Sequence, residues 1–139
     1  MFIQRIVAYL FGIVFIVVGI FGFIPLVAPK GALFGIFMVN PLHSIVHILL
    51  GILGMAVAVI NKEQLYTLYN KGIGIVYMLI GLLGFVPPLV PKGLLIGLIM
   101  INPADNLLHI AIGATLALVG FLVQEPRPNN PFQAAKYRI

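Results

Sequence analysis

The chain has 139 residues, of which 62% are hydrophobic and 8% are charged, and its mean hydropathy is +1.18. Soluble domains carry roughly 25% charged residues, so this composition excludes an ordinary water-soluble domain and indicates a membrane protein. Eight Lys and Arg against three acidic residues give a net charge of +5, which on so apolar a chain predicts contact with lipid headgroups rather than nucleic acid.

Four apolar segments predict transmembrane helices, since a span needs about 20 apolar residues. In chain order they are residues 6–27, 41–60, 72–90 and 103–123. The first follows Arg5 and resembles a signal peptide, but no small-residue cleavage site comes after it. We therefore expect all four segments to be retained as helices.

An internal repeat relates the two halves of the chain. Residues 12–51 align without a gap onto residues 74–113 at a constant offset of 62, and 18 of the 40 pairs are identical. Each copy holds two spans, so both copies cross the membrane in the same sense. The fold class predicted is an all-α integral membrane domain over residues 1–123, with repeats over about 5–61 and about 67–123. Two parallel two-helix repeats imply a pseudo-two-fold axis along the membrane normal.

The basic residues predict the orientation of the bundle. One side of the membrane receives Arg5, Lys62, Lys71, Arg127, Lys136 and Arg138. The other side receives only Lys30 and Lys92. The positive-inside rule then puts both termini in the cytoplasm, together with a Pro-rich tail over residues 124–139.

Residues at the helix ends predict how the spans begin. Asn40 and Asn102 each precede a proline, which predicts N-caps for the second and fourth spans. Asn61 is predicted to cap the third span in the same way. Tyrosines are expected at the cytoplasmic interface; these are Tyr9, Tyr66 and Tyr69.

Two short apolar runs, residues 32–39 and 94–101, precede the Asn-Pro pairs. Eight residues cannot span a bilayer, so we expect a short helix at the outer interface or a segment packed onto the bundle. Glycines recur at helical spacing in both repeats, which predicts close helix packing in lipid. The alternative is that glycine makes room for a flat ligand.

The spans contain one cluster of polar residues, almost all of them within about two helical turns of the outer helix starts. Its members are His43, Ser44 and His47 on the second span and Asp105, Asn106, His109 and Thr115 on the fourth. The repeat pairs His47 with His109 and His43 with Asp105. Asp105 either caps its own helix or forms an ion pair with a histidine across the axis.

Several roles are open to the histidines. His47 and His109 are the candidate cofactor ligands, and each is followed four residues later by a glycine. They could hydrogen-bond backbone carbonyls, or provide axial ligands to haem or chlorophyll. A metal site from His43, His47, His109 and Asp105 would suit Zn²⁺ or Fe. Proton sensing at the outer face is a further alternative.

Enzymatic and transport functions have little support in the sequence. There is no cysteine, no Gly-x-Ser-x-Gly motif and no phosphate-binding loop, so we expect a protein that is not an enzyme. The cytoplasmic half of the spans holds little that is polar beyond Tyr77. A proton or solute path needs polar groups through the whole thickness of the membrane, which disfavours transport.

The motifs Asn-Pro-x-His-x-x-x-His (residues 40–47) and Asn-Pro-x-Asp-Asn-x-x-His (residues 102–109) resemble an uncharacterised family of small four-helix bacterial membrane proteins. That family is carried as a domain of unknown function and occurs in cyanobacteria and actinobacteria. The resemblance extends to about residue 121 and departs at Ser44, where asparagine is expected. It implies a fold and a bacterial inner or thylakoid membrane, but no activity.

The interpretation that these observations favour is a non-catalytic accessory or scaffolding subunit of a larger complex, photosynthetic or respiratory. Its partners would be membrane lipid and other integral membrane subunits. A protein that binds a tetrapyrrole or a metal through its intramembrane histidines is the alternative. Transport of a small solute or of protons is the least favoured hypothesis.

Overall fold

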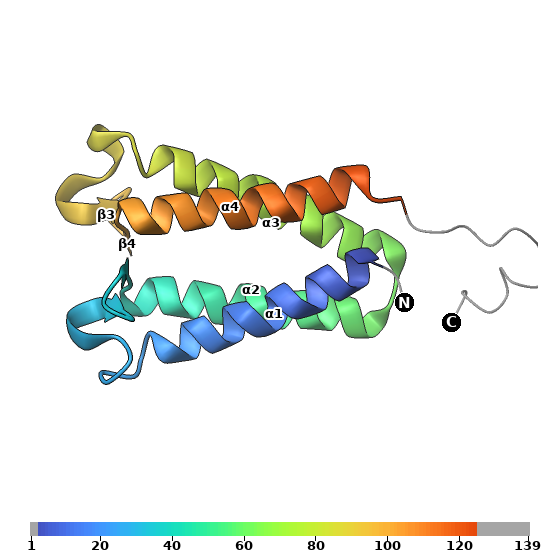
Figure 1. The fold of residues 1–139 in the computed structure, drawn as a ribbon, viewed down its shortest axis with the longest axis horizontal. Coiled ribbons are helices and arrows are strands. Elements are labelled where there is room, and N and C mark those ends of the chain that lie inside the picture. The colour runs from blue at the N-terminus through green and yellow to red at the C-terminus, as the bar shows by residue number, and fades with distance from the viewer. Residues whose placement is uncertain (1–2, 125–139) are drawn as a thin grey trace, which may run out of the picture.

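The computed structural model describes residues 3–124, and within them the chain forms four long helices in two antiparallel pairs (Figure 1). The helices are α1 (Ile3–Phe21), α2 (Pro41–Ile60), α3 (Glu63–Leu83) and α4 (Pro103–Leu122). α1 packs along α2, and α3 packs along α4. One end of the bundle, the hairpin end, carries the loops within each pair, while the α2–α3 connection and the first described residues lie at the other, the termini end.

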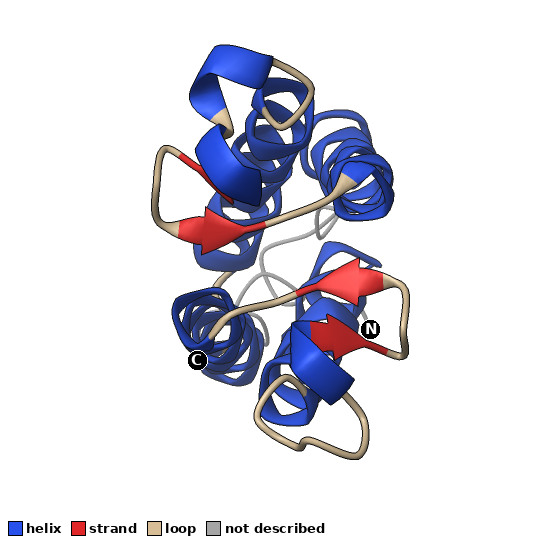
Figure 2. Ribbon diagram, turned by 90° about the vertical axis from the view of Figure 1, so that its left-hand side faces the viewer, coloured by secondary structure: helices blue, strands red, loops and turns tan. Residues whose placement is uncertain are grey.

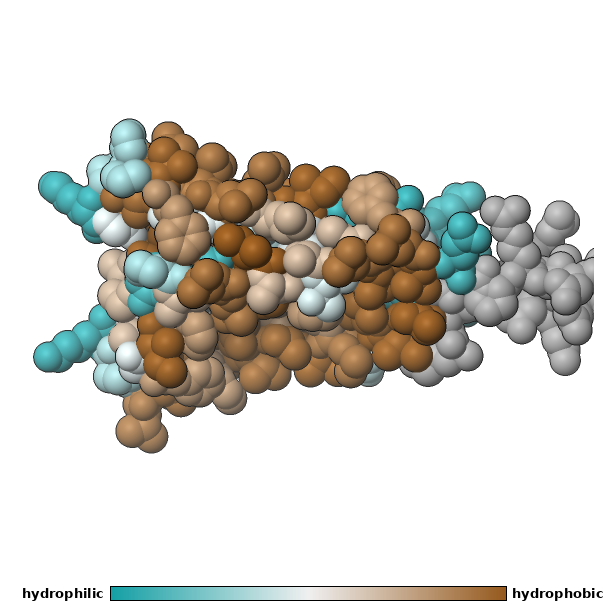
Figure 3. Space-filling view, turned by 45° about the horizontal axis from the view of Figure 1, so that its top comes forward, coloured by the Kyte–Doolittle hydropathy of each residue, from teal (hydrophilic) through white to brown (hydrophobic). Residues whose placement is uncertain are grey.

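Each of the four helices is long and apolar enough to cross a membrane. Large hydrophobic side chains are exposed along all of them; Leu49, Leu68, Leu79 and Leu118, for example, are more than half exposed. Figure 3 shows this apolar surface along the bundle, with hydrophilic residues towards the ends. The prediction of four helices, each long and apolar enough to span a membrane, is therefore confirmed.

The two even-numbered spans match the prediction closely, and the two odd-numbered spans do not. α1 ends at Phe21 rather than at residue 27, because Gly22 follows and Pro25 restricts the residue before it. α3 begins at Glu63 rather than at residue 72. Its first turns are polar in sequence, yet they form a helix whose inner face is buried.

The cap predicted at this connection is wrong. Asn61 does not cap α3; it ends α2 in the left-handed conformation, with φ at 57°, and Lys62 is the residue that precedes α3. Asparagine tolerates this conformation better than most residues. Tyr66 and Tyr69, which are predicted at the cytoplasmic interface, lie in the first turns of α3 and are buried in a cluster with Ala8.

The apolar runs at the hairpin end form β-hairpins rather than helices. β1 (Ala32–Leu33) pairs with β2 (Phe37–Met38), and β3 (Leu94–Leu95) pairs with β4 (Ile99–Met100) (Figure 2). A short helix is therefore the wrong prediction. The alternative, a segment packed onto the bundle, is confirmed by the burial of Leu33 together with Val18 of α1.

Local backbone requirements explain why these runs turn back on themselves. Phe34 and Gly35 both have positive φ, and so do Ile96 and Gly97. Two successive residues of positive φ make the tight turn that suits a β-hairpin. A glycine at the second position supplies that conformation without steric cost.

Glycines bring the helix backbones together, as predicted. A Cβ built on Gly51 would lie 2.6 Å from the carbonyl oxygen of Gly12, and one on Gly113 would lie 2.8 Å from that of Gly74. Neither position has room for a side chain. These glycines serve packing, so the flat-ligand alternative has no space there.

Buried polar groups also occur at the termini end, which the sequence interpretation missed. Asn70 donates to the carbonyl of Gln4 at 2.9 Å, and Gln4 donates to the carbonyl of Val123 at 2.6 Å. The expectation that this half holds little beyond Tyr77 is wrong. Most of the tail, residues 125–139, lies outside the described residues.

Candidate metal centre

Two asparagine side chains form hydrogen bonds at the hairpin end, both within their own helix caps and to the opposite half of the molecule. Asn40 accepts the backbone N–H of His43 and Asn102 accepts that of Asp105, both at 2.9 Å, so both predicted N-caps are confirmed. Each cap also reaches the opposite half of the molecule. Asn40 Nδ2 donates to the carbonyl of Leu98 and Asn102 Nδ2 to that of Ile36, both at 2.7 Å. The two contacts are related by the sequence offset of 62.

The carboxylate of Asp105 caps a helix rather than pairing with a histidine. Its Oδ2 accepts the backbone N–H groups of Asn102 and Met38, both at 2.9 Å. The first bond completes a capping box at the start of α4. Within residues 3–124 the carboxylate forms no ion pair with His43 or His47, so the ion-pair interpretation is wrong.

His43 occupies the equivalent place on α2 and makes the complementary bond. Its Nδ1 lies 2.9 Å from the carbonyl oxygen of Met100, the counterpart of Met38. A carbonyl only accepts, so the imidazole Nδ1 carries the proton and donates. In the neutral ring, Nε2 then keeps its lone pair. At equivalent positions of the two repeats, the carboxylate of Asp105 therefore accepts a backbone N–H, whereas the imidazole of His43 donates to a backbone C=O.

His109 is fixed in the same tautomer. Its Nδ1 lies 2.6 Å from the carbonyl oxygen of Asp105, one turn earlier on α4. A backbone carbonyl bound to one imidazole nitrogen orients the ring and leaves the other nitrogen basic, which is the arrangement found behind most metal-bound histidines. The interpretation of His109 as a residue bonded to a carbonyl is confirmed.

His47 differs, because neither of its ring nitrogens has a hydrogen-bond partner in the described part of the chain. Both nitrogens are shielded from solvent. The ring lies against those of His43, Phe15 and His109, with centroids 4.7, 5.6 and 6.0 Å away. A buried polar group with no partner costs about 1 to 3 kcal/mol, so its presence calls for an unseen partner.

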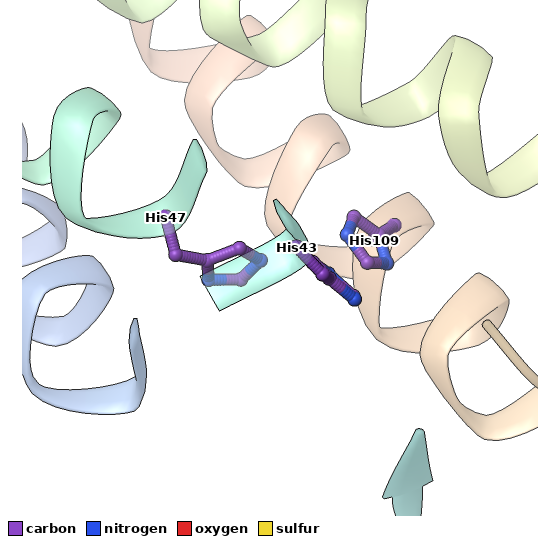
Figure 4. Close-up of side chains that lie close together, drawn as sticks. All are labelled: His43, His47 and His109. Atoms are coloured by element: carbon purple, nitrogen blue, oxygen red, sulfur yellow. The ribbon is translucent and has the colours of Figure 1, made fainter. Parts of the chain in front are cut away.

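The three histidines converge on one point between the two helix pairs. One ring nitrogen of each lies within 4.8 Å of one ring nitrogen of each of the others. Figure 4 shows His43 and His47 approaching from α2 and His109 from α4. Three of the four predicted metal ligands are brought together, while the fourth, Asp105, directs its carboxylate to backbone amides.

The other three residues of the predicted cluster do not join the histidines, and one of them, Thr115, donates its hydroxyl to the carbonyl of Ala111 at 2.9 Å. Ser44 packs against Gly22 and Asn106 against Gly84, at equivalent places in the two halves. A Cβ on either glycine would collide with the facing polar side chain. Ser44 and Asn106 therefore pack between the helices of each pair.

An aromatic pair closes the inner side of the histidine cluster. Phe15 and Tyr77 stack with centroids 4.9 Å apart and planes inclined by 19°. Tyr77 also lies against His109, at 5.0 Å, and its buried hydroxyl has no partner in the described residues. In the sequence, Tyr77 stands out only as an isolated polar residue. The sequence offset of 62 aligns Tyr77 with Phe15. This equivalence could have predicted that the two rings lie together between the helix pairs.

A cavity of about 140 Å³ adjoins the histidines. Its walls are mostly apolar and come from α1, the first β-hairpin, and α4. Drug-sized ligands and cofactors occupy pockets of roughly 300 to 1,000 Å³. A haem or chlorophyll ring does not fit in this cavity, whereas a metal ion with a small additional ligand does.

The fold and the site together define a helical membrane protein with a buried three-histidine cluster. The chain belongs to the family described as a domain of unknown function, DUF4383, whose model matches residues 5–122. The predicted resemblance to an uncharacterised family is thereby confirmed. No curated protein and no solved structure matches the chain.

Proposed function

We propose that this protein binds a divalent transition-metal ion, of the Zn²⁺ type, through His43, His47 and His109. The convergence of three imidazole nitrogens within 4.8 Å carries the proposal. Imidazole is a preferred ligand of Zn²⁺, Cu²⁺ and Fe²⁺. Three protein ligands and one open position make a metal site that can take a further ligand.

Small movements suffice to form the site. With Zn–N bonds of about 2.0 to 2.1 Å, tetrahedral geometry puts the ligand nitrogens roughly 3.3 Å apart. The nitrogens lie up to 4.8 Å apart, so the rings need to close by about 1.5 Å or less. His47 has no hydrogen bond to lose on moving, while His43 and His109 are held by their carbonyl partners.

The charge of the ion is partly balanced in the site. Asp105 lines the same cavity and its carboxylate is buried. A divalent cation in an apolar environment is costly unless it is paired. In the proposal, the carboxylate opposes the metal charge from behind the ligands while retaining its bonds to the amides of Asn102 and Met38.

A zinc titration tests the proposal. The purified protein in detergent would compete for Zn²⁺ with a chromophoric chelator. We expect one Zn²⁺ per chain, and a loss of affinity of at least about 100-fold in His47→Ala. Ser44→Ala is the matched control, because it removes a nearby polar group with no ligand role and should bind as the wild type does. Zinc affinity unchanged in His47→Ala would contradict the proposal.

We also propose that the two helix pairs are parallel repeats, with the hairpin end outside and both termini in the cytoplasm. The support is the recurrence of cross-contacts at the offset of 62 and the bias of basic residues towards the termini end. The chain has no cysteine, so single replacements can be labelled cleanly. An impermeant maleimide should label Lys30→Cys in intact cells and Lys62→Cys only after permeabilisation; the reverse pattern would refute the orientation.

The role as an accessory subunit of a larger complex stays a prediction, and so does the absence of catalysis. Binding of a metal is compatible with either. The tetrapyrrole alternative is disfavoured by the size of the cavity and by the way the histidines face one another rather than a plane.

A further inference from the structure

The cavity beside the histidines reaches the lipid-facing surface. Among its lining residues, Val14 of α1, Phe34 of the first hairpin and Leu108 of α4 are 46%, 55% and 40% exposed. These side chains form a rim in the apolar belt of the bundle. The cavity is therefore accessible to molecules dissolved in the bilayer.

The lining of the cavity combines a few polar groups with mostly apolar side chains. The polar groups include His43, His47 and His109, together with Tyr77, whose hydroxyl has no partner among the described residues. Phe15 and Phe37 provide aromatic surface in the same lining. Such a cavity complements a molecule that has one polar end and an otherwise apolar body.

The volume limits what can enter. The cavity measures about 140 Å³, and a cavity of about 150 Å³ lined by apolar side chains holds one benzene molecule. A single six-membered ring therefore fits, and an alkyl chain attached to it would extend past the rim into the lipid.

The net charge at the metal site favours one kind of donor atom for the fourth ligand. A divalent metal brings two positive charges, and the carboxylate of Asp105 brings one negative charge. One positive charge remains in a buried place, which favours a fourth ligand that can ionise. A phenolic oxygen meets this condition on releasing its proton to water, whereas a quinone carbonyl does not.

We infer that the cavity binds an alkylphenol dissolved in the membrane, with its ring beside Phe15 and Phe37 and its oxygen as the fourth metal ligand. The inference rests on the proposed function, since the oxygen completes the coordination of the metal held by the histidines. The alkyl chain leaves between Val14 and Leu108.

Photo-crosslinking in lipid nanodiscs tests this inference. The probe is a para-alkylphenol with a diazirine near the start of its chain, and bound zinc is measured in every sample. With Zn²⁺ bound, we expect crosslinks at Val14, Phe34 and Leu108. They should fall by about tenfold when zinc is removed, and also when the methyl ether replaces the phenol.

Two matched substitutions distinguish binding in the cavity from nonspecific contact of the probe with the lipid-facing surface. Val14→Trp fills the rim and should lower crosslinking by about tenfold while zinc binding is kept. Val76→Trp is the matched control, because Val76 is the equivalent residue of α3, is 44% exposed and is not among the residues lining the cavity. It should crosslink as the wild type does.

Results that contradict only the binding of the phenol differ from results that also contradict the metal site. Zinc bound without crosslinks at the rim would overturn this inference and leave the metal site standing. Crosslinking that is equal with and without zinc, or equal in Val14→Trp, would also overturn it, since the phenol would then be neither a metal ligand nor a cavity ligand. A wild-type protein that binds no zinc would end the proposed function and this inference together.

Discussion

Replacing Asp105 by alanine is expected to destabilise the metal-free protein strongly, because one buried oxygen serves two halves of the molecule. Oδ2 accepts N–H groups from Asn102, in its own helix cap, and from Met38, in the opposite hairpin, both at 2.9 Å. Hydrogen bonds to a charged group contribute about 1.5 to 3 kcal/mol each. Taking the lower end for each bond gives a loss of about 3 kcal/mol for Asp105→Ala.

His43→Ala is the natural comparison, since His43 stands at the equivalent position of α2. It loses one neutral bond, from Nδ1 to the carbonyl of Met100, which contributes about 0.5 to 1.5 kcal/mol. The two side chains bond to different backbone groups and not to each other. The double variant should therefore lose the sum of the two effects to within about 0.5 kcal/mol.

The assay is reversible unfolding in mixed micelles, followed by circular dichroism with EDTA present so that metal binding does not contribute. Asp105→Asn serves as the isosteric control and should keep part of the stability, because its amide oxygen can still accept. A coupling of more than about 1 kcal/mol between the single variants would contradict this expectation, since it would show an ion pair between Asp105 and His43 instead of two separate caps.

Three further outcomes are expected. His47→Ala should leave the stability of the metal-free protein within about 1 kcal/mol of the wild type, because it removes two unpartnered nitrogens along with its ring contacts; thermal unfolding with and without zinc checks this. Zinc affinity should fall as the pH is lowered, because protons compete for the imidazoles, and chelator competition across pH 8 to 5 measures it. Gly51→Ala should cost about 2 kcal/mol or more, since its Cβ would lie 2.6 Å from the carbonyl of Gly12, whereas Gly72→Ala meets nothing within 4 Å and should be neutral or stabilising.

The regular parts of the fold followed from sequence patterns that depend on few long-range contacts. Asn40 and Asn102 before proline are local signals, and the starts of α2 and α4 were placed correctly by them. The glycine spacing likewise predicted close helix packing, which Gly12 and Gly51 provide. The ends of α1 and α3 were misplaced because apolar composition continues beyond Phe21, while the polar first turns of α3 become buried only in the folded bundle.

The candidate site was predictable as a group of residues but not as an arrangement. The repeat brought His47 and His109 into equivalent places, and helical spacing put His43 beside His47. The local sequence does not indicate that Met38 and Met100 contact the opposite helix pair. These contacts depend on the β-hairpins, and an eight-residue apolar run forms a hairpin only if two of its residues adopt positive φ. Those contacts determine that the Asp105 carboxylate accepts backbone N–H groups and that His43 donates from Nδ1.

The most direct test of the metal site is X-ray absorption at the zinc edge of the zinc-loaded protein. We expect three imidazole nitrogens and one further light atom at about 2.0 to 2.1 Å from the zinc, with one imidazole fewer in His47→Ala. A first shell made only of oxygen atoms, or a spectrum unchanged by His47→Ala, would contradict the assignment of His43, His47 and His109 as the metal ligands.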